Sequence, residues 1–205
     1  MTDQKPMGIT FGSLGVLGPK AITNIATDAQ TLGYQSIWTV EATGTDALTM
    51  LGAVSQAAPN LDLGTGIVPI QIRTPALAAM SAATLQALNP DVDVWLGVGV
   101  SAPGILSQHG TPTTDKPIGL MREYVALFRE CLSGESVTFE GDYFQTKRFR
   151  LGMRLGERKP KIVMAALNPQ MLKLAGEVAD GVLLNYLPSS HVQPSIDQVR
   201  KVGPA

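Results

Sequence analysis

Short apolar strands alternate with amphipathic helices along most of this chain of 205 residues. The alternation predicts a sheet of parallel strands, because a helix is the usual connection between two parallel neighbours. Several of the apolar runs are nearly continuous, which is typical of strands covered on both faces. The predicted strands are residues 7–12, 36–40, 61–68, 92–98, 161–166 and 182–184.

Helix signals follow each predicted strand. Thr74-Pro75 and Asn168-Pro169 each place a capping side chain before a proline in the first turn, which is typical of a helix start. Gly33 is suited to end the first helix. The predicted helices cover 19–32, 46–57, the segment from Pro75 to Asn89-Pro90, 118–132, a segment that starts at 168–169 and ends before 180, and 190–202.

Two segments interrupt the alternation. Residues 100–116 are rich in Gly, Pro, Ser and Thr and are expected to form a loop, and residues 134–156 predict a β-hairpin insertion with a turn at Gly141-Asp142. The fold class is therefore α/β, a TIM-barrel-like (β/α) fold that is incomplete, with about six β/α units plus the hairpin, where a closed barrel has eight. We expect one domain, residues 1–205.

Composition narrows the class of protein. Hydrophobic residues make up 44% of the chain and the formal net charge is −1, which gives no overall charge signal for nucleic acid or an anionic membrane surface. The single cysteine, Cys131, excludes an intramolecular disulfide framework and is expected to be a buried thiol. We expect a cytoplasmic protein that acts on a small molecule, with neither nucleic acid nor membrane as a partner.

Ligands of such barrels meet the carboxyl ends of the strands, and this rule selects candidate residues without any motif. Glu41 is the acid at the end of the second strand, where it would either orient a ligand or cap the loop. The other strand ends contribute Gly66 and Ile67, then Gly97, Val98, Gly99 and Ser101, then Ala165, Ala166, Leu167 and Asn168.

Two of these strand ends have a physical argument for binding. The glycines at 64, 66, 97 and 99 would let a flat ring approach the backbone, although a bulge or tight packing explains them equally well. The helix that starts at Asn168 offers backbone N–H groups around residues 167–171 to an anion, although a simple helix cap needs the same residues.

No metal-ligand spacing is present. His109 and His191 are the only histidines, lie far apart in the sequence, and are expected to be solvated. Trp38 and Trp95 lie within predicted strands and are expected to pack inside the barrel. Arg73 is expected to serve the loop before the helix that starts at Pro75.

Taken together, several segments resemble the bacterial luciferase-like monooxygenase superfamily. They include LGYQSIWTVE, DALTMLGAVSQAAPNLDLGTGIVPIQIRTPALAA, VWLGVGVS, MREYVALFRECLSGESVTFEGDYF and PKIVMAALNPQMLKLAGEVADGVLLN. Within that superfamily, GTGIVP, GVGVS and AALNP are similar to the branch that depends on coenzyme F420.

The resemblance implies a TIM barrel that binds F420, or alternatively FMN, at the carboxyl ends of its strands. It implies a non-prolyl cis peptide at Gly66-Ile67 behind the cofactor ring, cofactor contacts at 97–101 and 165–168, and a place for Glu41 near the reactive edge of the ring. Relatives often carry Gly-Gly or Gly-Ser where this chain has Ala166-Leu167, and they continue through two further strands.

Three functions remain open on these residues. The first is an F420-dependent oxidoreductase that transfers hydride to or from an unknown small organic substrate, the second is an FMN-dependent monooxygenase or reductase, and the third is a shortened protein that binds a cofactor without catalysis. A six-unit sheet also leaves its first and last strands as free edges, so we expect a homo-oligomer, most simply a dimer.

Overall fold

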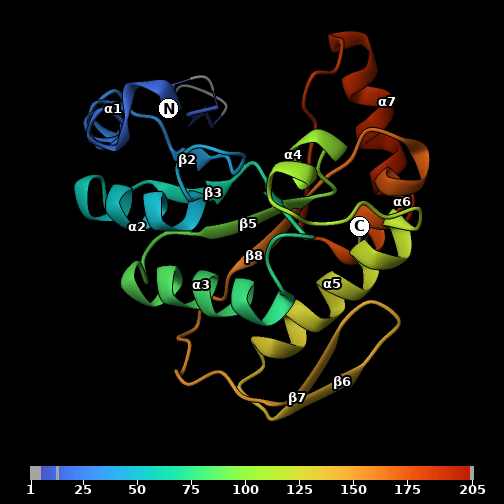
Figure 1. Ribbon diagram of the computed structural model, residues 1–205. Helices are drawn as coiled ribbons and strands as arrows, with labels where there is room; N and C mark the ends of the chain where they lie inside the picture. Colours follow the sequence, from blue (N-terminus) through green and yellow to red (C-terminus); the bar gives the residue numbers. More distant parts are fainter. Residues whose placement is uncertain (1–5, 13, 204–205) are drawn as a thin grey trace.

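The computed structural model describes residues 6–12 and 14–203, which form a curved parallel sheet with helices on its outer face (Figure 1). The strand order is β1-β2-β3-β5-β8-β9, each pair is parallel, and the short β4 also pairs with β5. The strands are β1 (Gly8–Thr10), β2 (Ser36–Thr39), β3 (Asp62–Thr65), β4 (Val68–Pro69), β5 (Val94–Gly99), β8 (Lys161–Ala165) and β9 (Gly181–Leu183). The predicted open (β/α) barrel of about six units is confirmed.

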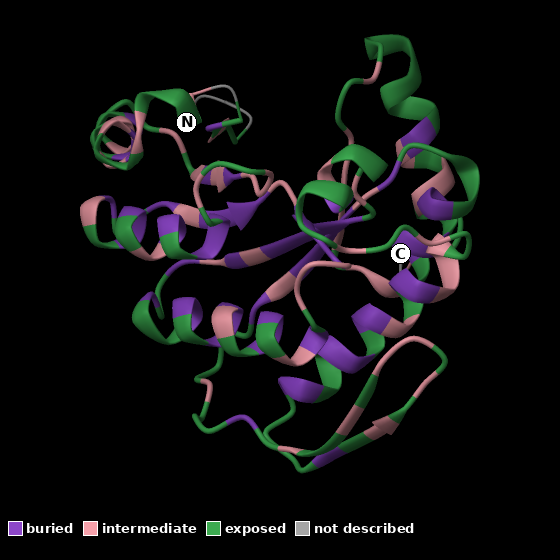
Figure 2. Ribbon diagram, in the orientation of Figure 1, coloured by how far each residue is buried: buried purple, intermediate pink, exposed green. Residues whose placement is uncertain are grey.

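Successive helices pack side by side around the outside of the sheet. They are α1 (Pro19–Thr31), α2 (Ala47–Ala57), α3 (Pro75–Leu88), α5 (Pro117–Cys131), α6 (Pro169–Val178) and α7 (Ser189–Arg200). The buried residues follow the strands and the helix faces that are turned toward them (Figure 2). None of the helices within the described residues has both the length and the apolar character needed to cross a membrane.

Local sequence chemistry explains where the helices start and stop. The side chains of Asp46, Thr74 and Asn168 each accept a hydrogen bond from a backbone N–H three residues later, at 2.7, 3.3 and 2.9 Å. A proline occupies the first turn of α1, α3, α5 and α6, and Gly33 has a φ of 84° just beyond α1. The capping residues read from the sequence at Thr74, Asn168 and Gly33 are confirmed.

The predicted hairpin is present as the antiparallel pair β6 (Val137–Glu140) and β7 (Gln145–Phe149). Its turn is held by Glu123 on α5, whose carboxylate accepts backbone hydrogen bonds from Asp142 and Tyr143 at 2.9 Å and from Phe144. Gly141 is needed there because a Cβ at this position would overlap the Glu123 carboxylate.

Two sequence predictions are corrected by the structure. Residues 100–116 are not entirely loop, because α4 (Pro103–Gln108) lies within them; it is too short to show a helical period. The single predicted strand 61–68 is divided into β3 and β4, because the chain leaves the ladder at Gly66-Ile67 and β4 then pairs with β5. A short 3-10 turn, η1 (Gly15–Leu17), also precedes α1.

Candidate functional site at the carboxyl ends of the strands

The break between β3 and β4 brings four of the predicted site residues together. The peptide bond between Gly66 and Ile67 is cis, as the resemblance implied. The side chain of Ile67 lies over Gly99 at the end of β5, where an added Cβ would be 3.1 Å from Ile67 Cγ1 and 3.3 Å from Ala165 Cβ. Gly66, Ile67, Gly99 and Ala165 therefore form a small-residue platform across β3, β5 and β8.

Gly97 and Gly64 have packing reasons that do not involve a ligand. A Cβ at Gly97 would overlap the carbonyl oxygen of Thr65, whose hydroxyl also bonds the Gly97 backbone N–H and C=O at 2.8 Å each. A Cβ at Gly64 would overlap the ring of Trp38. For these two glycines the packing alternative left open by the sequence explains the residue type.

The remaining predicted cofactor residues lie around the platform with different exposure. Val98 and Ala166 are buried in the hydrophobic core, so they support the strand ends from within. Ser101 is half-buried after β5, and Leu167 is 52% exposed before α6. The Asn168 side chain already accepts from the Met171 N–H, and Pro169 has no N–H, so this helix start has fewer free donors than the sequence suggested.

A cleft of about 620 Å³ lies on the concave side of the sheet, between β1 and β2 on one side and the end of β9 on the other. A pocket of this size lies within the range of about 300–1,000 Å³ found for small-molecule sites. Its walls carry no Asp, Glu, Lys, Arg or His side chain. The lining residues are Gly8, Ile9, Thr10, Gly12, Trp38, Val40, Gly66, Leu183, Leu184, Asn185 and Tyr186.

Trp38 contributes more to this cleft than the sequence predicted. Its ring lies on the concave face, where Gly8 and Gly64 leave room for it, and its Nε1 donates to Ser36 Oγ at 2.9 Å. Trp38 thus packs inside the curved sheet, as expected, and also forms one wall of the cleft. In the sequence, the glycines on the neighbouring strands were the signal that a large side chain lies on this face of the sheet.

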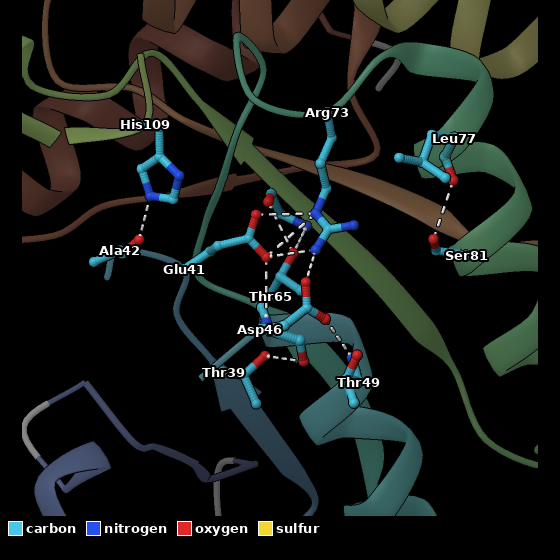
Figure 3. A network of polar contacts seen from close by, with 12 residues as sticks. Thr39, Glu41, Ala42, Asp46, Thr49, Thr65, Arg73, Leu77, Ser81 and His109 are labelled. Atoms are coloured by element: carbon cyan, nitrogen blue, oxygen red, sulfur yellow. Dashed lines mark hydrogen bonds and ion pairs between the residues drawn. The ribbon is translucent and has the colours of Figure 1, made fainter. Parts of the chain in front are cut away.

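Glu41 lies beside the platform and is tied into a polar network (Figure 3). Its carboxylate accepts from Arg73 Nε and Nη2 at 2.9 Å each and from the Ala47 backbone N–H at 3.2 Å. Its own backbone N–H donates to the carbonyl of Ile67 at 3.1 Å. Both side chains are largely buried, at 7% exposure for Glu41 and 13% for Arg73.

A second carboxylate, Asp46, contacts Arg73 from the start of α2. Partial burial alone would raise the pKa of Asp46, but hydrogen bonds from Thr49 and the charge of Arg73 outweigh it and hold this pKa below its usual value. Burial likewise opposes the charged form of Arg73, yet Glu41 and Asp46 raise the pKa of Arg73 above its usual value. Arg73 therefore stays cationic and joins its own loop before α3 to the connection between β2 and α2, a role broader than the one read from the sequence.

His109 connects the end of α4 to the same region. Its Nε2 lies 2.5 Å from the carbonyl oxygen of Ala42, next to Glu41 in the chain (Figure 3). The side chain is exposed, as expected, but it has a protein partner that the sequence did not indicate. No group of three His, Cys, Asp or Glu side chains suited to a metal is found among the described residues.

Comparison with known proteins identifies the family of this chain. The family model for luciferase-like monooxygenase matches residues 6–204. The chain belongs to the luciferase-like monooxygenase family. The superfamily inferred from the sequence segments is therefore confirmed.

Relatives within the luciferase-like monooxygenase family include F420-dependent enzymes. The chain is 30% identical to the F420-dependent glucose-6-phosphate dehydrogenase of Tsukamurella paurometabola over 182 residues, covering 81% of this chain and 53% of that protein. It is 28% identical to the 5,10-methylenetetrahydromethanopterin reductase of Methanolobus tindarius, covering 87% of this chain and 54% of the relative.

The fold is shared with a solved structure of an F420-dependent enzyme. The coenzyme F420-dependent tetrahydromethanopterin reductase of Methanopyrus kandleri superposes with a TM-score of 0.80 at 22% identity, covering 95% of this chain and 59% of that structure. The chain thus spans little more than half the length of the relatives it matches.

Proposed function

We propose that this chain forms the cofactor-binding part of a coenzyme F420-dependent oxidoreductase that acts on a small organic substrate. The observation that carries the proposal is the similarity over most of the chain to relatives named for F420-dependent reactions.

The platform fits a flat ring system. Gly66 and Ala165 place almost no side-chain bulk at the strand ends, and Ile67, which covers the buried Gly99, offers an apolar surface. The adjoining cleft has Trp38 and Leu183 in its walls and no charged side chain, which suits the apolar faces of a deazaflavin ring. The residues present therefore fit the group that the relatives use.

Each part of the chain would have a distinct task in the reaction. A bound deazaflavin supplies a carbon, C5, that accepts or donates hydride. The platform of Gly66, Ile67, Gly99 and Ala165 would orient its ring, and the walls of the cleft would exclude water. Ser101, Leu167 and Asn168 would contact the rest of the cofactor, with Gly97, Val98 and Ala166 supporting them from below.

Glu41 is best supported as a positioning residue. Its carboxylate is already bonded to Arg73 and to the Ala47 N–H, while its backbone N–H bonds the Ile67 carbonyl. Glu41 would thereby fix the position of the backbone around Ile67, on which the cofactor ring would rest. The resemblance places Glu41 near the reactive edge of the ring and makes it the candidate catalytic residue, and direct contact of Glu41 with a reacting group stays a prediction.

Anaerobic titration with F420 and, separately, with FMN tests the proposal. We expect saturable binding of F420 with a shift in its absorbance, and weaker or no binding of FMN. Tyr186→Ala, which removes a side chain 97% exposed at the cleft, should weaken F420 binding about fivefold, and Leu32→Ala, on an exposed position outside the cleft, should not.

The other outcomes decide between the two cofactors or overturn the proposal. Tight binding of FMN with no binding of F420 would identify FMN as the cofactor and favour an FMN-dependent monooxygenase or reductase. A folded protein that binds neither cofactor would overturn the proposal and leave a protein of this family without this chemistry.

A further inference from the structure

The net charge of −1 hides a strongly basic segment. Residues 147–161 contain seven of the chain's 16 Lys and Arg and only one of its 17 Asp and Glu. This segment therefore has a formal charge of +6, and the rest of the chain has a formal charge of −7. It covers the end of β7, the connection to β8 and the first residue of β8.

Only part of this positive charge is neutralised by the protein. Asp93 pairs with Arg158 at 2.7 Å and with Lys161 at 2.6 Å. Arg150 reaches Glu135 at 3.8 Å, and both of those side chains are mostly exposed. Among the residues that the structure describes, Arg154 and Lys159 have no carboxylate within ion-pair distance.

Arg154, Lys159 and the weakly paired Arg150 meet at one cavity. A hollow of about 650 Å³ lies between the segment after α5 and the β7–β8 connection, and Arg150, Arg154 and Lys159 all line it. Glu135 is the one acid in its wall, and its side chain is 82% exposed. The rest of the wall is mostly apolar side chains from residues 132–155, and Gly134 and Gly152 add backbone without side-chain bulk.

This cavity is separate from the platform. The β7–β8 connection enters β8 at Lys161, whereas the platform residue Ala165 is at the other end of that strand. The hairpin β6–β7 and the connection lie beyond α3 and α5, away from α4 and the strand ends beside it (Figure 1). A ligand here would not compete with a cofactor at the carboxyl ends of the strands.

We propose that this cavity binds a small ligand that carries two or more phosphate or carboxylate groups. Like charges held around one hollow repel each other, and a multivalent anion removes that repulsion while it gains charge-assisted hydrogen bonds. Two guanidinium groups favour planar, two-point recognition of such oxygens, and Lys159 adds a third cation. The site does not depend on the function proposed above.

Calorimetric titration of the full chain with pyrophosphate and, separately, with citrate tests this proposal and distinguishes the two chemistries. We expect 1:1 saturable binding of at least one of them, at moderate ionic strength and without any deazaflavin. The double variant Arg154→Gln/Lys159→Gln should weaken it about tenfold or more.

Two matched controls separate a site from general charge attraction. Lys147→Gln/Arg148→Gln removes the same two charges from the same segment, but neither residue lines the cavity, so the affinity should change by less than about threefold. Gly152→Leu places a side chain in the cavity, where an added Cβ meets nothing within 4 Å, and should block binding. Gly156→Leu has the same local freedom outside the cavity and should not.

The proposal fails if neither anion binds saturably, or if both charge pairs weaken binding equally. Circular dichroism of each variant checks that the chain remains folded. Should the Arg154/Lys159 pair unfold the protein, the Gly152→Leu and Gly156→Leu comparison decides the question alone, because it changes no charge.

Discussion

At the scale of single residues, Tyr124 on α5 is a buried group that the fold does not satisfy. Its hydroxyl has no hydrogen-bond partner among the described residues, and its ring contacts Phe144 edge-on at 5.6 Å between centroids. Burial raises the pKa of Tyr124 well above its usual value; the charge of Arg73 opposes this rise and the charge of Glu41 adds to it. The hydroxyl therefore costs desolvation without a compensating bond.

Tyr124→Phe should accordingly leave the protein as stable or stabilise it by about 1 kcal/mol, measured by urea unfolding. Tyr186→Phe is the matched control at an exposed position and should have no effect. A clear loss of stability in Tyr124→Phe alone would mean that the hydroxyl is bonded in solution.

Breaking the buried ion pair of Glu41 and Arg73, in contrast, should destabilise the protein. Arg73→Met would leave the Glu41 carboxylate, 7% exposed, without its cation, so the free energy of unfolding should fall by about 3 kcal/mol. Asp46→Asn removes a partner whose side chain is 45% exposed and keeps the helix cap, so it should cost less than about 1 kcal/mol. Similar losses in both variants would show that burial does not set the strength of this network.

At the scale of elements, the sequence predicted most of the architecture and little of the site's polar contacts. Apolar runs and capping pairs such as Thr74-Pro75 are local signals, so the strands and the principal helices could be placed. The division between β3 and β4 was missed because residues 63–68, Leu-Gly-Thr-Gly-Ile-Val, contain no proline or charged residue that would mark the break. The Glu41–Arg73 pair joins positions 32 residues apart, and no local pattern encodes such a contact.

Strands β5 and β8 are joined at their start by an ionic contact that should depend on pH. A hydrogen bond from Lys161, opposed by partial burial and reinforced by Arg158, holds the pKa of Asp93 below its usual value. A lowered carboxyl pKa stabilises the fold above the unfolded value of about 3.9, and this stabilisation is lost as the pH falls through the folded value.

Asp93→Asn should therefore cost about 1 kcal/mol at neutral pH and should lessen the loss of stability below about pH 4. Unfolding measured between neutral and acidic pH checks this, with Asp115→Asn at an exposed loop position as the control. If the free energy of unfolding of Asp93→Asn falls with acidic pH as steeply as that of the wild type, other carboxylates cause the acid sensitivity.

At the scale of the whole molecule, the two edges of the sheet carry backbone groups without a neighbouring strand among the described residues. β1 and β9 each pair with a single strand, and the cleft between them exposes parts of Trp38, Val40 and Leu183. Free backbone groups at an edge and a concave apolar face both favour association with another chain. We therefore expect a dimer in which a second copy covers these edges.

Light scattering should then give twice the chain mass of 21.7 kDa. Thr10→Lys places a charge on the exposed edge strand β1 and should shift the protein toward the monomer, because a lysine at an edge opposes strand pairing. Thr84→Lys adds the same charge on the exposed side of α3 and should leave the dimer intact. A monodisperse wild-type monomer, or equal dissociation by both substitutions, would mean that the edges and concave face of this sheet remain open to solvent.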